Sequence, residues 1–232
     1  MHRRRRMTFV TLLSLLTIAA GLVFQNIENQ HITNQKKAVQ TTTNQQLATS
    51  ALETLEVKGR APKTGYKREL FGQGWQQSGE CDTRNTILAR DLQHTVIENC
   101  KVQRGTLEDP YTGKTIHFSR GATTSDDVQI DHVVALSDAW QKGAQKLDQD
   151  TREILANDPL ELLAVDGESN QQKSDSDAAS WLPPNKEYRC RYVARQIAVK
   201  QKYVLWITQA EHDTMKLVLQ NCPDQVLPVT QP

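Results

Sequence analysis

Two residues with different chemical roles stand side by side in the segment VQIDHVVAL, residues 128–136. Asp131 and His132 interrupt a run of apolar and β-branched residues that is typical of a buried strand. Because neighbouring side chains on a strand point to opposite faces, the two cannot both enter one core. Near a strand end, however, twist or a bulge can bring a neighbouring carboxylate and imidazole to the two sides of one small site.

The chemistry of such a pair is specific. A carboxylate oxygen suits a hard divalent cation, and an imidazole with an ordinary pKa of about 6.5 suits proton abstraction from water. A metal ligand and a general base are the minimum set for phosphodiester hydrolysis. The competing interpretation is structural, with His132 hydrogen-bonded and Asp131 as its partner or a turn former. A third polar residue is needed, and SNQQKSD supplies Asn170 and, one helical turn later, Lys173.

The surrounding patterns predict the elements that position these residues. A turn and strand, a strand, a helical insert, a strand and a short helix are expected at residues 109–121, 128–136, 137–158, 159–166 and 167–180. Upstream, apolar residues at helical spacing predict one helix over 83–99, capped by Thr83 or Asn85.

The segments IDHVVAL (130–136) and LLAVDGESNQQKSD (162–175) together resemble the HNH, or ββα-metal, endonucleases, in particular the group related to the C-terminal domain of GmrSD-type restriction endonucleases. Further motifs extend the likeness over roughly residues 66–222: CDTRN at 81–85, DPYTG at 109–113, WLPP at 181–184 and YRCRYVARQIAVK at 188–200. The resemblance implies an α+β fold in which a ββα-metal core is embedded in a mainly helical single domain with disulfides.

The resemblance also implies a role for each candidate residue. Asp131 and Asn170 would bind the metal, His132 would be the general base, and Lys173 would contact the scissile phosphate or a neighbouring one. Oxygen ligands favour Mg²⁺ or Mn²⁺ over Zn²⁺.

The chain departs from the HNH pattern at one position. The central asparagine, expected near residue 161, is Glu161 here. That residue usually holds the catalytic loop and the histidine in place, so the orientation of His132 is in question. Asn157 could compensate, or Glu161 could accept the second imidazole N–H and raise the basicity of the ring.

Basic residues are concentrated in KEYRCRYVARQIAVKQKYVLW, residues 186–206, where apolar residues lie between them. This pattern predicts an amphipathic helix with a cationic outer side, which is either a solvated face or a phosphate-binding one. The candidate nucleic-acid-binding residues are Arg84, Arg120, Arg189, Arg191, Arg195 and Lys200.

The N-terminus has the features of an export signal. Arg3 to Arg6 precede the apolar stretch 7–24, so residues 1–24 are expected to be a signal peptide or a retained anchor. Loss of this segment would lower the formal charge from +1 to about −3, because it removes four arginines and no acid. A globally basic nucleic-acid-binding protein is therefore excluded. Residues 25–60 are rich in Gln, Asn and Thr, which predicts a disordered tether before a nuclease domain at 61–232.

Cysteine usage agrees with export. Four cysteines lie beyond the signal, and in an oxidising compartment they are expected to form disulfides. Three pairings are formally possible. Cys81 with Cys100 and Cys190 with Cys222 are favoured because each bond closes a local loop. A zinc site is the weaker interpretation, since no C-x-x-C pair is present.

These observations predict a secreted, metal-dependent endonuclease of low sequence specificity that acts on DNA, with RNA as a second option. It is expected to be a monomer that meets a membrane only through an uncleaved N-terminal segment. The main alternative is a nuclease-fold protein that binds nucleic acid or the cell envelope without cleaving. An esterase or protease is disfavoured, because neither G-x-S-x-G nor H-E-x-x-H occurs.

Overall fold

The computed structural model describes Gln25, Gln30 and residues 46–229. The expected signal at 1–24 lies outside the described residues, as does most of the stretch 25–45. Within the part that is described, no helix is both long and apolar enough to cross a bilayer.

Helices are combined with three small antiparallel sheets in the described part of the chain, so the fold is α+β. The α-helices are α2 (Ala48–Leu52), α3 (Thr83–Asp91), α4 (Leu136–Gln141), α5 (Gln149–Asn157), α6 (Gly167–Lys173), α7 (Arg189–Lys202) and α8 (Gln209–Leu219). Short 3₁₀ turns are η1 (Arg68–Phe71), η2 (Ser125–Asp127), η3 (Ala144–Lys146) and η4 (Lys186–Tyr188). The strands are β1 (Gln77–Ser78), β2 (Cys81–Asp82), β3 (Gln93–Glu98), β4 (Lys101–Glu108), β5 (Thr115–Ser119), β6 (Val128–His132) and β7 (Leu162–Asp166).

The antiparallel hairpin of β6 and β7 separates two hydrophobic cores. Ile130 and Leu162 belong to a core shared with α3 and the sheet β3–β4–β5, whereas Leu163 and Val165 belong to a larger core shared with the helices. Both faces of the hairpin are therefore buried, which accounts for the nearly continuous apolar run in each strand. The side chain of Asp166 caps α6, which follows β7 directly.

The predicted helix over 83–99 is wrong beyond Asp91. Residues 93–98 form the edge strand β3, which pairs with β4. The sequence QHTVIE contains three β-branched residues, which favour a strand. Backbone pairing with β4 stabilises the strand over the predicted helix. Asn99 and Cys100 have positive φ angles of 46° and 61° and make the tight turn between the two strands. The cap of α3 is Asp82 rather than Thr83 or Asn85.

The predicted helical insert is split into α4 and α5. Gly143 has a φ of 126°, and a Cβ there would lie 3.2 Å from the Trp206 ring, so this position favours glycine and ends the first helix. Asp148 then accepts a hydrogen bond from the Thr151 backbone N–H and starts the second helix.

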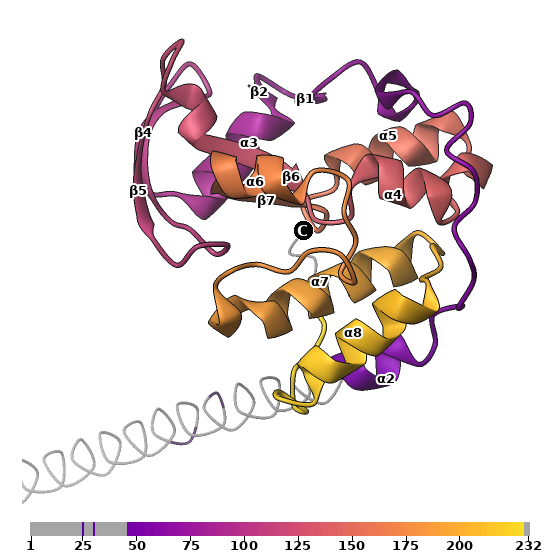
Figure 1. Cartoon of the computed structure of the whole chain (residues 1–232). Helices are drawn as coiled ribbons and strands as arrows, with labels where there is room; N and C mark the ends of the chain where they lie inside the picture. The colour runs from indigo at the N-terminus through magenta and orange to yellow at the C-terminus, as the bar shows by residue number, and fades with distance from the viewer. Residues whose placement is uncertain (1–24, 26–29, 31–45, 230–232) are drawn as a thin grey trace, which may run out of the picture. The chain divides into compact units, whose positions relative to one another are not determined.

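The folded unit begins earlier than the expected boundary at residue 61. It starts at Gln46, and the short helix α2 packs against α7 and α8 with Ala48, Ala51 and Leu52 buried (Figure 1). The backbone N–H of Ala48 donates to the Gln225 carbonyl, so this segment is tied to the C-terminal stretch. An isolated helix of this length would not be stable, so α2 depends on packing of its three buried residues against α7 and α8.

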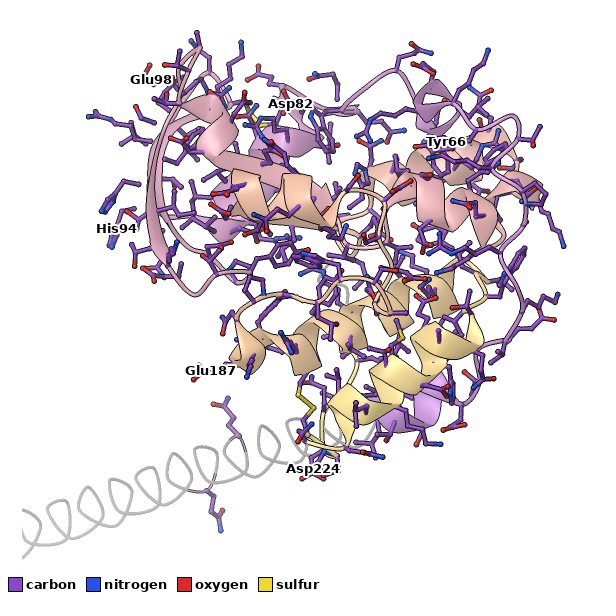
Figure 2. The ribbon with its side chains drawn as sticks, in the orientation of Figure 1. Tyr66, Asp82, His94, Glu98, Glu187 and Asp224 are labelled. Atoms are coloured by element: carbon purple, nitrogen blue, oxygen red, sulfur yellow. A yellow bond between two sulfur atoms is a disulfide. The ribbon has the colours of Figure 1, made fainter. Side chains whose placement is uncertain are left out.

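Two disulfides join the favoured pairs. Cys81–Cys100 links the start of α3 to the β3–β4 turn, and Cys190–Cys222 links α7 to the stretch after α8. In Figure 2 the second bond lies between the labelled Glu187 and Asp224. Each disulfide restrains a separate local loop of the unfolded chain.

A buried cluster of charges fastens the C-terminal helices to the rest of the fold. Lys142 Nζ lies 2.8 Å from Asp138, 2.8 Å from Asp177 and 2.6 Å from Glu211, and Lys200 Nζ lies 2.9 Å from Glu211. Burial opposes the charge of Lys200, but the nearby Glu211 and Asp138 outweigh it and raise its pKa. With Arg60 on Asp177, three cations meet three carboxylates.

Lys200 is completely buried in this cluster, which corrects the prediction that it contacts a phosphate. The basic residues of α7 lie on more than one face of the helix. Lys200 lies on the buried face, where Glu211 and Asp138 neutralise it. Charge counting along the helix could not separate this lysine from the exposed ones.

Replacing Lys200 by Met should lower the free energy of unfolding by about 3–5 kcal/mol, because it leaves Glu211 buried with one cation fewer. Lys186→Met is the matched control, since Lys186 is an exposed lysine of the turn η4 just ahead of the same helix. Urea unfolding of both variants measures the difference. Equal stabilities would show that the buried cluster does not hold the helices.

Candidate active site

Asp131 and His132 end strand β6 and point to opposite faces of the hairpin. Asp131 lies opposite Leu163 and faces the larger core, where both of its oxygens have partners. Its Oδ1 lies 2.8 Å from Lys173 Nζ, and its Oδ2 accepts a hydrogen bond of 2.5 Å from the Tyr111 hydroxyl. Burial raises the pKa of Asp131, against the opposing effect of Lys173.

Lys173 is completely buried at the end of α6. Besides Asp131, its ammonium donates a 2.8 Å hydrogen bond to the backbone carbonyl of His132. This position corrects the expectation that Lys173 meets a phosphate, because its donors are directed at β6 rather than at the surface. The residue fixes the end of the strand and the direction of the carboxylate.

The His132 ring is held on the other face. Its Nε2 lies 2.9 Å from the carbonyl oxygen of Ala156, and its ring stacks on Trp75 with 6° between the planes and 5.8 Å between the centroids. A carbonyl only accepts hydrogen bonds, so Nε2 carries the hydrogen and Nδ1 keeps its lone pair. Burial, and then the charge of Arg68, lower the pKa of His132 to about 3, so the ring is neutral at pH 7.

Asn170 lies on α6 and completes the predicted group. Its Nδ2 donates a 2.9 Å hydrogen bond to Gln129 Oε1 on β6. Asp131, His132 and Asn170 all line one hollow of about 180 Å³, together with Arg68. Residues from two segments that the sequence singled out, 128–136 and 167–180, thus line one small hollow.

The oxygen ligands of this hollow suit a hard divalent ion by type. Asp131 and Asn170 both offer oxygen, and a carboxylate has about four acceptor positions, of which Lys173 and Tyr111 use two. By type, this donor set fits Mg²⁺ or Mn²⁺. In the described part of the chain, no group of three or more His, Cys, Asp or Glu is arranged to hold a metal.

Glu161 is fully buried, and its carboxylate does not bind His132. Its Oε2 accepts a 3.3 Å hydrogen bond from the Val134 N–H, and its backbone carbonyl accepts another from Val133. It therefore holds the loop that follows His132, while the carbonyl of Ala156 takes the ring N–H. Its Oε1 is buried without a hydrogen-bond partner among the described residues, and burial raises the pKa of this carboxyl well above its usual value.

Asn157, the suggested substitute for the missing asparagine, acts elsewhere. Its Oδ1 accepts a 2.9 Å hydrogen bond from the Gln76 N–H, directly after Trp75. It thereby positions the residue that stacks on His132, rather than the catalytic loop.

The arginines named as nucleic-acid contacts make structural contacts within the protein, four of them through hydrogen bonds to backbone carbonyls and Arg191 through an aromatic ring. Arg195 donates to the carbonyls of Pro159, Leu160 and Leu162, and Arg189 donates to that of Pro183. Arg84 donates to the backbone carbonyls of Ser125 and Val128. Arg120 donates to the Val102 carbonyl and to Asn85 Oδ1, and the Arg191 guanidinium lies over the Tyr188 ring. Contact of these arginines with nucleic acid stays a prediction.

Three residues of the site were not expected from the sequence. Tyr111 was visible within DPYTG as part of a turn and of a resemblance motif, with no role of its own, although it donates to Asp131. Arg68 and Trp75 lie in the segment RELFGQGW, whose closely spaced glycines and aromatic residues are the one signal that marks it.

The Glu161→Gln variant should become more stable relative to the unchanged protein as pH rises. The folded carboxyl keeps its proton at pH values where the unfolded one, with a pKa of 4.5, has lost it, so the unchanged protein loses stability above that pH. The difference should grow by about 1.4 kcal/mol per pH unit until the folded pKa is reached, and be constant below the unfolded value. Urea unfolding at several pH values measures it.

Glu168→Gln, at an exposed glutamate in the first turn of α6, serves as the control and should show a difference that does not change with pH. A flat profile for Glu161→Gln as well would mean that this carboxyl is ionised in the folded protein.

Comparison with known proteins identifies the family of the chain. The family model described as GmrSD restriction endonucleases, C-terminal domain, matches residues 82–217. A protein of Arthroderma benhamiae described as an uncharacterized secreted protein is 38% identical over 178 residues, which cover 75% of this chain and 84% of that protein. The matched region contains β6, β7 and α6 and leaves out Arg68 and Trp75. The chain belongs to the family of the C-terminal domain of GmrSD restriction endonucleases.

Proposed function

We propose that the protein is an exported, metal-dependent endonuclease that hydrolyses phosphodiester bonds, with β6, β7 and α6 as its ββα-metal core. The observation that carries this proposal is the His132 ring, whose tautomer is fixed by Ala156 in the hollow that Asp131 and Asn170 also line. A neutral imidazole with a free lone pair beside oxygen ligands is the arrangement that water activation requires. Membership of a nuclease-related family supports the same reading.

His132 would act through Nδ1. Its Nε2–H bond to Ala156 keeps the ring in place, so Nδ1 accepts the proton of the attacking water as the new oxygen–phosphorus bond forms. Stacking on Trp75 prevents the ring from rotating away. Burial lowers the pKa of His132 to about 3, so Nδ1 is unprotonated throughout the neutral range, and the same shift makes the ring a weaker base than a free imidazole.

Asp131 and Asn170 would hold the divalent ion, Mg²⁺ or Mn²⁺. When bound, such an ion neutralises charge on the phosphoryl group and stabilises the departing 3′-oxygen. The chain contributes the orientation of the ligands. Lys173 and Tyr111 hold the Asp131 carboxylate, and Gln129 holds the Asn170 amide so that its oxygen is available.

DNA is the proposed substrate, and RNA is the alternative for the same chemistry. The described residues include no second module that could read base edges, so selection would depend on backbone shape and charge. The description of the Arthroderma benhamiae relative as secreted, and the two disulfides, support an extracellular site of action.

One observation favours a second candidate function, a binding module that retains the nuclease scaffold without cleavage. Both Asp131 oxygens are already engaged, by Lys173 and by Tyr111, and Glu161 replaces the central asparagine of the HNH pattern. Such a protein would bind nucleic acid or an envelope component and leave phosphodiester bonds intact.

Nicking of a supercoiled plasmid with added Mg²⁺ or Mn²⁺ tests the proposal. His132→Ala should lower the rate by about 10²–10⁴, the usual contribution of a general base. Asp131→Ala and Asn170→Ala should also raise the metal concentration that is needed for half-maximal cleavage. His117→Ala, at an exposed histidine of β5, is the matched control and should cleave at the unchanged rate.

Chelation of the divalent ions should abolish cleavage by the unchanged protein. If His132→Ala nicks the plasmid as fast as the unchanged protein, or if purified protein binds DNA and never cleaves it, the enzyme proposal fails and the binding module is favoured.

A further inference from the structure

A segment outside the family match forms one wall of the proposed site. Figure 2 labels Tyr66 and Asp82, between which this segment, Arg68 to Trp75, passes. It lines a hollow of about 370 Å³ on one side of His132, next to the hollow of about 180 Å³ that Asn170 lines. Arg68, His132 and Leu136 line both hollows, so these residues stand at their common border.

The wall is anchored at both ends by α5. The Arg152 guanidinium donates a 2.9 Å hydrogen bond to the Leu70 carbonyl, and Asn157 accepts one from the Gln76 N–H. Between these points, Phe71 is buried against Trp140. Gly72 has a φ of 105°, which a residue with a side chain rarely adopts, and it lets the chain turn toward Trp75. The backbone that carries Arg68 is therefore fixed.

The Arg68 side chain differs from the other arginines around the site. It is exposed, and it makes no hydrogen bond or ion pair with the part of the chain that the structure describes. Arg152 and Arg195, in contrast, donate to backbone carbonyls. Arg68 nevertheless borders the site, since it lines the smaller hollow together with His132 and Asn170.

The charges nearby fit an anion beside Arg68. In the smaller hollow, the Asp131 carboxylate is already neutralised by Lys173, which leaves Arg68 as the unpaired charge there among the described residues. Glu69 lines the larger hollow and does not line the smaller one. A guanidinium matches the oxygens of a phosphate with two parallel hydrogen bonds.

We propose that Arg68 is the substrate-binding residue of this site and holds the backbone phosphate that enters the smaller hollow between His132 and Asn170. The proposal rests on the proposed function and deepens it, because it names the residue that brings the phosphate to the base. Arg68 takes the role that the sequence assigned to Lys173, and it supplies this contact from outside the ββα-metal core.

The test measures binding and cleavage separately with the full-length chain. Binding of a fluorescein-labelled DNA duplex is followed in EDTA, where no divalent ion supports cleavage, and plasmid nicking is followed with Mn²⁺. Arg68→Ala should weaken duplex binding about tenfold, the value of one hydrogen-bonded charge contact. It should also lower the slope of log affinity against log salt by about 0.9. In the nicking assay, kcat/KM should fall by at least the same factor.

Lys67→Ala is the matched control, because it removes an equal exposed charge one residue away that lines neither hollow. It should change the affinity by less than about twofold. Arg68→Lys should recover part of the affinity and leave the salt slope as in the unchanged protein, since the charge is kept.

The two proposals fail in distinguishable ways. If the unchanged protein cleaves and Arg68→Ala binds and cleaves equally well with the same salt slope, the Arg68 proposal is overturned and the nuclease stands. If Arg68→Ala loses affinity but the unchanged protein never cleaves, the phosphate contact stands and the nuclease proposal fails. No measurable binding of the duplex by the unchanged protein at low salt would overturn the Arg68 proposal.

Discussion

The structure depends on a hairpin that is buried on both faces. A polar side chain on such a hairpin cannot form hydrogen bonds with solvent, so other protein groups must provide its hydrogen-bond partners on the side to which it points. Asp131 points to the larger core, where Lys173 and Tyr111 meet it, and His132 points to the other side, where Ala156 and Trp75 meet it. The need to satisfy two neighbouring polar groups on two opposite sides brings α6, α5 and the segment before β1 to the end of β6.

The same rule governs the helical part. Lys142 and Lys200 are buried completely, and the acids that neutralise them come from α4, α8 and the loop after α6. Removing one partner of a buried ion pair lowers stability strongly, whereas replacing the whole cluster by apolar residues often does not. The cluster therefore matters chiefly because it specifies which helix faces pack together. The cluster thereby fixes α7 against α4, the helix that directly follows the His132 loop (Figure 1).

Several features could be predicted from the sequence because they depend on local patterns. The two strands around Asp131 and Leu163, the short helix with Asn170 and the disulfide pairs follow from periodicity, caps and spacing. The roles of Lys173 and Lys200 could not be predicted. The sequence does not distinguish an exposed lysine from one that is buried beside acids distant in the chain. The strand β3 was missed for a related reason. Its apolar residues fit a helical spacing, and only pairing with β4 decided otherwise.

The short helix α2 also determines where a stable fragment of this chain can begin. Leu47 bridges to Val226, and Ala48, Ala51 and Leu52 cover apolar surface of α7 and α8. A fragment that starts at residue 61 would lack this cover and would expose the apolar surface of both helices to solvent. A fragment that starts at Gln46 retains it, which makes that residue the natural boundary for a truncated form.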